Sequence, residues 1–466
     1  MKRLLFLLFV CLASLNGWGQ DIAGDWSGVL KLQGGIQLRL VFHIQPSESG
    51  YDATMDSPDR GKKGIPVTSV SYENSVLKLT VASIGAEYEG ALGATGNIAG
   101  TFRQMGQVFP LNLSKEIVEK EKAARPQEPV KPYPYYEEEV TFENREDGVT
   151  LAGTLTLPQK EGVFPAVVLV SGSGAQNRDE ELLGHKPFLV IADYLTRNGI
   201  AVLRFDDRGT AASTGNFATA TSYDFSKDVE AGVKYLKTRK EINKAKIGLA
   251  GHSEGGIIAP MVAARSKDVA FIVLLAGVGT RGDQLLLQQQ DLIAEASGVG
   301  EEERKRAGSI NKGAFDIVLK STDTEQLTIA LTDYLRQAIE DIPDAEESEE
   351  SKETFITTSV TQMASPWTQY FIRYDPAPVL GKVKCPVLAI NGGKDLQVPA
   401  KVNLEAIKAA LDRGGNKRVT TKEFPGLNHL FQECTTGLPA EYAAIEQTFS
   451  PVALNEILTW IKVQTQ

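Results

Sequence analysis

The segment GHSEGG, residues 251–256, carries the clearest chemical signal in this 466-residue sequence. It follows the apolar run 246–250 and precedes the helical pattern 257–264. A serine on a sharp turn between a strand and a helix is lifted above the sheet edge, and flanking glycines leave room for that turn and for close helix packing. We therefore interpret Ser253 as a nucleophile that sits at the N-terminus of a helix, where exposed N–H groups face developing negative charge.

A serine hydroxyl is a poor nucleophile at neutral pH, so Ser253 needs a base within hydrogen-bond reach. The chain has four histidines. His43 lies in a region with a different pattern, His185 precedes the nucleophile, and His252 adjoins it and is expected to point elsewhere. His429 follows the last apolar strand on a loop, and we predict that it is the base.

The carboxylate that orients the base is expected after the nucleophile and before the base. Asp395 fits because it lies in the turn after a buried strand, at the end where open α/β sheets keep their sites. Such an acid fixes the imidazole tautomer without taking its proton. Asp283 is the alternative, while Asp206 and Asp207 are interpreted as a structural ion-pair turn with Arg208.

Two backbone N–H groups are the expected donors to the oxyanion of the tetrahedral intermediate. One is the N–H of Glu254, the residue after the nucleophile. The second is expected in the loop SGSGA, residues 171–175, where two glycines permit a close backbone approach. Ser173 is the first choice there and Gly172 the alternative.

The segments around these residues alternate between strand and helix patterns, as in an α/β fold. A hairpin (139–142 and 151–157) is followed by continuous apolar strands that alternate with amphipathic helical segments. The strands are expected at 164–170, 200–205, 246–250, 271–276, 386–391 and 418–424, and helices at 187–197, 223–237 and 403–411. Strands that are apolar on both faces and joined by helices predict a doubly wound, mostly parallel sheet.

One interval breaks this rhythm, because about 100 residues separate the strand at 271–276 from the strand at 386–391. The interval is helical in pattern and strongly charged, and a structureless loop of that length would be improbable. It predicts a helical cap, at about 280–382, that covers the site. The acidic stretch 341–353 within it is interpreted as a solvated face or a mobile loop.

The N-terminal part of the chain reads differently. Between residues 25 and 113 apolar and polar residues alternate in short runs, which predicts a small antiparallel barrel or sandwich of roughly eight strands. His43 in that region is interpreted as a hydrogen-bonded structural residue. The domains are therefore predicted as 21–114 for the β-domain, 115–136 for a semi-rigid proline-rich linker and 137–466 for the catalytic domain.

Residues 1–20 have the charge, apolar run and small residues of a cleaved signal peptide, so we expect export to the periplasm or the extracellular space. No later stretch predicts a transmembrane helix. Cys385 and Cys434 are too few for a disulfide scaffold or a four-cysteine metal site, and the sequence leaves their pairing open. The net charge of −10 argues against nucleic acid or an anionic membrane as partner.

Five segments together resemble the α/β-hydrolase superfamily, namely 170–180, 205–210, 251–256, 392–399 and 426–431. Within it the chain is similar to bacterial exported esterases allied to dienelactone hydrolases and prolyl oligopeptidase-type peptidases. The resemblance implies hydrolysis through an acyl-enzyme without a metal or a cofactor. The family's oxyanion loop usually begins with His-Gly, where this chain has Ser171-Gly172, and Ala211 stands where the family has Gly.

The leading hypothesis is a carboxylic ester hydrolase that acts on a small-molecule ester. One alternative is an exported aminopeptidase or acyl-peptide hydrolase. Another is a non-catalytic binding protein on a hydrolase scaffold. The oligomeric state is left open.

Overall fold

The computed structural model describes residues 22–31, 37–47, 50–60, 62–104, 107–117, 124–340 and 349–466. These residues form two compact units, one up to residue 117 and one from residue 124 onward. The predicted signal peptide lies outside the described residues, so export stays a prediction. Most of the acidic stretch after Glu340 lies outside them as well.

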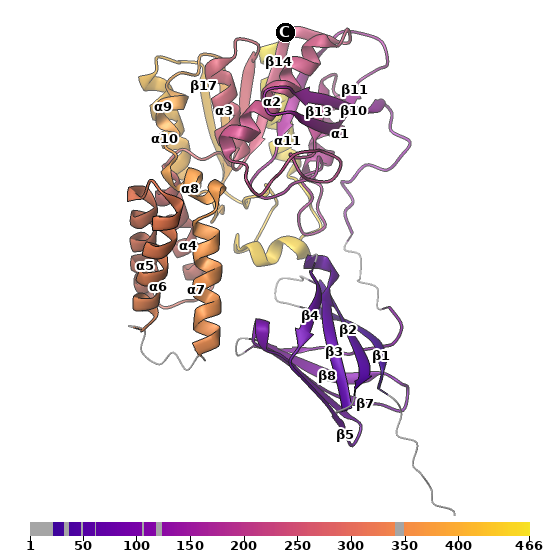
Figure 1. Ribbon diagram of the computed structural model, residues 1–466. Helices are drawn as coiled ribbons and strands as arrows, with labels where there is room; N and C mark the ends of the chain where they lie inside the picture. Colours follow the sequence, from indigo (N-terminus) through magenta and orange to yellow (C-terminus); the bar gives the residue numbers. More distant parts are fainter. Residues whose placement is uncertain are drawn as a thin grey trace, which may run out of the picture. The chain divides into compact units, whose positions relative to one another are not determined.

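The first unit consists of two antiparallel meanders (Figure 1). One sheet has the order β1-β2-β3-β4 and the other β5-β6-β7-β8-β9. Both contribute to one core, in which Trp26 and Phe42 meet Tyr88 and Phe102. The predicted antiparallel β-domain is confirmed, with nine strands among the described residues. They are β1 Gly24–Lys31, β2 Gln37–Ser47, β3 Gly50–Ser57, β4 Lys62–Val67, β5 Ser69–Glu73, β6 Val76–Val81, β7 Ala86–Leu92, β8 Ile98–Gln104 and β9 Gln107–Pro110.

The second unit is built on an eight-stranded sheet of order β10-β11-β13-β12-β14-β15-β16-β17. The hairpin β10–β11 and the β11–β13 pair are antiparallel, and every later pair is parallel. The predicted doubly wound, mostly parallel sheet is therefore confirmed. Its strands are β10 Tyr136–Asn144, β11 Val149–Leu157, β12 Phe164–Val170, β13 Ala201–Phe205, β14 Ile242–His252, β15 Phe271–Leu275, β16 Val387–Gly392 and β17 Val419–Phe424.

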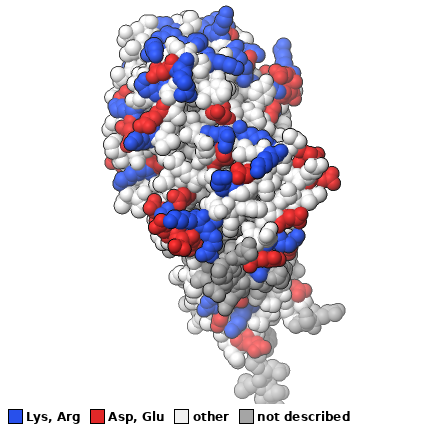
Figure 2. All heavy atoms as spheres, turned by 90° about the vertical axis from the view of Figure 1, so that its left-hand side faces the viewer, with Lys and Arg blue, Asp and Glu red and all other residues white. Residues whose placement is uncertain are grey.

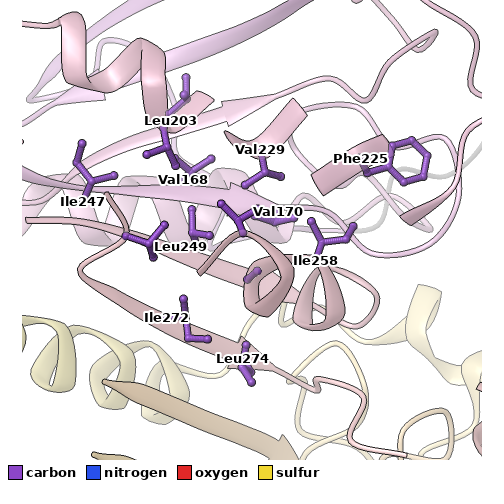
Figure 3. Packing of buried hydrophobic residues seen from close by; sticks show 14 of the residues in the cluster. Val168, Val170, Leu203, Phe225, Val229, Ile247, Leu249, Ile258, Ile272 and Leu274 are labelled. Atoms are coloured by element: carbon purple, nitrogen blue, oxygen red, sulfur yellow. The ribbon is translucent and has the colours of Figure 1, made fainter. Parts of the chain in front are cut away.

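Helices cover both faces of this sheet because successive residues of a strand point to opposite faces. Val168 of β12 packs with residues of α2 and α3, whereas its neighbour Val167 belongs to a separate cluster with residues of α1 and α11. Figure 3 shows the first cluster, where Val229 of α2 and Ile258 of α3 lie over the strand residues. The helices are α1 Pro187–Arg197, α2 Ser222–Thr238, α3 Gly255–Arg265, α10 Ala400–Arg413 and α11 Pro451–Thr465.

A helical insertion between β15 and β16 forms a group of its own beside the sheet (Figure 1). Its core contains Phe315, Leu327, Leu331 and Ile372. The predicted cap is thus confirmed as a helical insertion. Its helices are α4 Gly282–Ala296, α5 Glu301–Lys320, α6 Thr324–Glu340, α7 Glu349–Met363, α8 Pro366–Arg373 and the short α9 Ala377–Leu380.

The described part of the proline-rich segment, from residue 124 onward, is bound to the catalytic unit. The Arg125 guanidinium donates to the main-chain carbonyls of Gly184, Ala443 and Ile445. Gln127 donates to the carbonyl of Phe449 at 2.7 Å. The described part of this segment is therefore anchored to loops of the catalytic unit.

Cys385 and Cys434 are both free thiols. None of the helices in the described ranges combines the length and the apolarity that a membrane crossing requires. On the face seen in Figure 2, Lys and Arg side chains lie interspersed with Asp and Glu side chains over the catalytic unit.

Candidate active site

The backbone at Ser253 has the strained geometry of a sharp strand-to-helix turn. Strand β14 ends at His252 and α3 begins at Gly255, and between them Ser253 has φ 54°, in the left-handed region that non-glycine residues rarely adopt. A Cβ on Gly251 would lie 2.0 Å from the carbonyl oxygen of Gly255, so the turn tolerates only glycine there. The Ser253 N–H is held by the Leu275 carbonyl at 2.8 Å.

His429 and Asp395 form a buried pair at the ends of two neighbouring strands. His429 Nδ1 lies 2.8 Å from Asp395 Oδ2, and their side chains are 6% and 0% exposed. The other oxygen, Asp395 Oδ1, accepts the N–H groups of Gln397 and Val398, each at 2.8 Å. The carboxylate is thus fixed by the backbone and holds the imidazole so that Nε2 is left for proton transfer.

The alternative acid, Asp283, is engaged elsewhere. It lies in the first turn of α4 and forms a two-point ion pair with Arg281, with both distances at 2.6 Å. No hydrogen bond joins it to a histidine among the described residues. The geometry therefore favours Asp395 as the partner of His429.

The acidic pair after β13 is structural, but the predicted pairing with Arg208 inside the turn is wrong. Asp206 binds Arg178 at 2.8 Å, and Arg208 binds Asp228 of α2 at 2.6 Å. The Asp207 carboxyl is buried, and desolvation raises its pKa well above the usual value. Asp206 and Arg208 are each paired with a charged residue at least 20 positions away, which the local sequence could not reveal.

Ser253 and His429 line one cavity of about 310 Å³. No hydrogen bond joins the Ser253 hydroxyl to the imidazole in the described part of the chain, which is common for nucleophile and base before substrate binds. The cavity has an apolar wall, made partly by the cap, of Val278, Leu285, Leu286, Trp367, Phe371, Val398 and Leu430. Its uncharged polar lining includes the side chains of Gln176, Gln289, Gln362 and Gln397.

The predicted oxyanion donors differ in what they already bind. The backbone N–H groups of Glu254 and Ser173 have no protein acceptor among the described residues. In contrast, the Gly172 N–H donates to Glu180 Oε1 at 2.7 Å. The geometry therefore favours Ser173 over Gly172 as the second donor.

The side chain of Glu254 connects the turn to three other elements, a role that sequence reasoning missed. Its Oε1 accepts the Ser222 hydroxyl at 2.6 Å and the indole N–H of Trp367, on cap helix α8, at 2.8 Å. The Ser173 side chain also binds this carboxyl, and burial raises its pKa despite these bonds. The sequence signal for this role was an acidic residue in an apolar turn, because a buried carboxyl needs hydrogen-bond donors.

None of the other three histidines is placed to act as the base for Ser253. His43 lies between Asp25 at 2.7 Å and Asp56 at 3.3 Å in the first unit. His185 is fully buried against the Tyr442 carbonyl. His252 points away from the hydroxyl of its neighbour and toward the main chain of His429, as expected.

Residues 147–419 match the family described as X-Pro dipeptidyl-peptidase (S15 family). The chain belongs to this family. The resemblance to the α/β-hydrolase superfamily is confirmed with it, and this S15-family chain has the α/β-hydrolase fold.

The S15-family chain is also similar to known esterases. It is 28% identical over 301 residues to the esterase EstD of Thermotoga maritima, a match that covers 64% of this chain but only 62% of that esterase. Among solved structures, the Pyrococcus furiosus esterase Pf2001 is 16% identical with a TM-score of 0.41, covering 71% of this chain and 93% of that one. Est1E from Butyrivibrio proteoclasticus, solved with ferulic acid, is 18% identical with a TM-score of 0.39, covering 70% and 99%.

Proposed function

We propose that this chain is a serine carboxylic ester hydrolase with Ser253 as nucleophile, His429 as base and Asp395 as the orienting acid. The observation that carries the proposal is the buried contact of 2.8 Å between His429 and Asp395, beside a serine with φ 54° that lines the same cavity. A strained serine and an oriented imidazole that line one cavity are the arrangement that a nucleophile and its base require, which supports these roles.

The reaction follows from this arrangement. Ser253 Oγ attacks the ester carbonyl carbon while His429 Nε2 takes the hydroxyl proton. The oxyanion accepts the N–H groups of Glu254 and Ser173, the C–O bond to the alcohol breaks, and His429 returns the proton to the departing oxygen. A water molecule, activated by the same imidazole, then hydrolyses the acyl-enzyme to the free acid.

The cavity favours an uncharged substrate. Among the described residues that line it there is no Lys or Arg, and its two carboxyls, Glu180 and Glu254, already accept hydrogen bonds from protein groups. The cap-side wall of Leu285, Leu286 and Phe371 suits an apolar acyl chain. The similarity to EstD, named an esterase, supports the same reading.

The second candidate function is hydrolysis of peptides, which the S15 family description favours. A peptidase that recognises a free N-terminal amine needs an anionic group facing the substrate. Burial raises the pKa of Glu254, whose carboxyl is bound by Ser222 and Trp367, and Glu180 is bound by Gly172. Both carboxyls already bind protein groups through Oε1, and burial favours the neutral form of Glu254, so ester hydrolysis is the better-supported function.

The test compares p-nitrophenyl acetate and butyrate with aminoacyl- and X-Pro-p-nitroanilides, using the wild-type protein and Ser253→Ala. We expect turnover of the esters by the wild type and loss of at least about 10³-fold of kcat in the variant. Preference for the anilides would favour the peptidase. Absence of all turnover in the wild type would favour the non-catalytic binding protein.

A further inference from the structure

Two buried residues connect the predicted oxyanion loop to the predicted base. His252 Nε2 lies 3.0 Å from the carbonyl oxygen of His429, and His252 Nδ1 lies 3.0 Å from Glu180 Oε1. The same Glu180 oxygen accepts the N–H of Gly172 at 2.7 Å. The side chains of Glu180 and His252 are 6% and 9% exposed, so water is largely excluded from this chain of contacts.

The hydrogen-bonding partners of His252 indicate which of its ring nitrogens carry a proton. A carbonyl oxygen only accepts hydrogen bonds, so His252 Nε2 must carry a proton. Burial by itself lowers the pKa of His252, but the adjacent Glu180 carboxylate reverses this, and the pKa is raised overall. The contact between His252 Nδ1 and Glu180 Oε1 needs a proton between the two atoms, and the raised pKa of His252 favours placing it on the imidazole, where its charge compensates the burial of the carboxyl.

The pair lies where small displacements would matter for catalysis. His252 directly precedes Ser253 in the chain, and its ring centroid is 4.8 Å from that of His429. Glu180 has φ 50°, a left-handed backbone conformation that is unfavourable for glutamate. Such strain persists only where surrounding contacts hold it, and it concentrates at functional sites.

We propose that Glu180 and His252 form a positioning pair. The pair holds the main chain of His429 and the oxyanion loop at the correct positions relative to Ser253. This inference rests on the proposed function and goes beyond it, because neither residue touches the reacting atoms. Through Gly172 the pair also occupies the N–H that is the alternative to Ser173 as oxyanion donor. Both residues line the cavity, but Glu180 Oε1 and both ring nitrogens of His252 are engaged by protein groups, so we expect the pair to affect the chemical step more than binding.

The experiment measures kcat and KM on p-nitrophenyl butyrate for three variants of the full chain. His252→Leu removes the donor to the His429 carbonyl, and we expect kcat to fall by about 100-fold with KM within about twofold. Glu180→Gln removes the charge but keeps an acceptor for Gly172, and we expect a fall of about tenfold. His252→Gln retains an N–H donor near the position of Nε2 and should recover most of the kcat lost in His252→Leu.

Asp228→Asn is the matched control, because Asp228 and Arg208 also form a buried ion pair but touch none of the reacting groups. It should lower the thermal midpoint without changing kcat. The rate of Ser253 labelling by a fluorophosphonate, measured well below each midpoint, should follow kcat across all variants.

The inference is overturned if His252→Leu and Glu180→Gln keep kcat within twofold of the wild type and lose only stability, as Asp228→Asn does. It is also overturned if His252→Gln is as slow as His252→Leu, since the donor would then have no positioning effect. A wild type that neither turns over esters nor reacts with the fluorophosphonate would overturn the proposed function, and this inference with it.

Discussion

At the scale of single residues, the site is defined by which N–H and carboxyl groups are already engaged. Asp395 has both oxygens occupied and binds His429, whereas the N–H groups of Ser173 and Glu254 have no protein acceptor within the described ranges. The contrast with Gly172, whose N–H is bound, is what assigns the second oxyanion donor. The role of Ser173 can be tested by removing its backbone N–H.

Ser173→Pro removes this N–H, and we expect kcat on p-nitrophenyl butyrate to fall by about 10²-fold with little change in KM. The reason is that such a donor contributes about 3 kcal/mol to the transition state and much less to the ground state. The measurement is steady-state kinetics over a range of substrate concentrations.

Ser173→Ala is the control, because it keeps the N–H and loses only the hydroxyl that binds Glu254. It should keep kcat within a few-fold of the wild type. Equal activity of the proline and alanine variants would show that the donor lies elsewhere in the loop.

The three residues of the proposed triad could be found from the sequence because each follows a strong local pattern. Ser253 stands in a glycine-rich turn, Asp395 follows a buried strand, and His429 was selected from only four histidines. Glu180 could not be found, because its partner His252 lies 72 residues further along and nothing periodic connects them. The bond from Trp367 to Glu254 spans 113 residues and left no local signal either.

At the scale of elements, the sheet places the nucleophile and the cap shapes the space above it. The predicted strand 164–170 is reproduced as β12, and helix 187–197 as α1, because long apolar periodicities determine such elements. The cap was predicted from its length, but the sequence could not say which side of each cap helix faces the cavity. Leu286 of α4 and Phe371 of α8 line the cavity, so we expect the cap to select the acyl chain in the proposed ester hydrolase.

Leu286→Ala should therefore extend the range of acyl chains that the cavity accepts. We expect the ratio of kcat/KM for p-nitrophenyl hexanoate over acetate to rise about tenfold, because space for an additional methylene or two is worth about 0.8 kcal/mol each. The measurement is the ratio itself, which is insensitive to the fraction of active protein.

The matched control is Leu319→Ala, a partly buried leucine of α5 that packs in the cap core and does not line the cavity. It should leave the ratio unchanged. A similar change of the ratio in both variants would mean that the cap acts through its stability and not through its wall.

At the scale of the whole molecule, the catalytic unit is stabilised by hydrogen bonds between segments far apart in sequence. His185 is fully buried, with Nε2 2.9 Å from the Tyr442 carbonyl and Nδ1 3.0 Å from the Thr448 hydroxyl. Nearby, Arg125 binds the carbonyls of Ala443 and Ile445. None of these contacts was predictable, since each joins a histidine or arginine to a group more than 250 residues away.

Acid should lower the free energy of unfolding through the buried His185. Burial lowers the pKa of His185 from 6.5 to about 4. Between these values the unfolded chain binds one proton more than the folded chain, so stability is complete above pH 6.5 and falls as the pH drops toward 4. One pKa unit corresponds to about 1.4 kcal/mol, so the loss from this residue is up to roughly 3 kcal/mol.

We expect the free energy of unfolding by urea to fall less between pH 7.5 and about pH 4.5 in His185→Gln than in the wild type. The comparison between the two proteins removes the contribution of carboxylates, which titrate in both. Parallel pH dependences would show that His185 does not contribute to the acid sensitivity.

The central claim is that Ser253 becomes the acylated residue. The most direct measurement is mass spectrometry of the protein after reaction with a fluorophosphonate, with peptide mapping of the adduct. We predict one adduct, on the peptide that contains Ser253, formed far more slowly in His429→Ala because the base is absent. An adduct on another residue, or equal labelling in Ser253→Ala, would contradict the account.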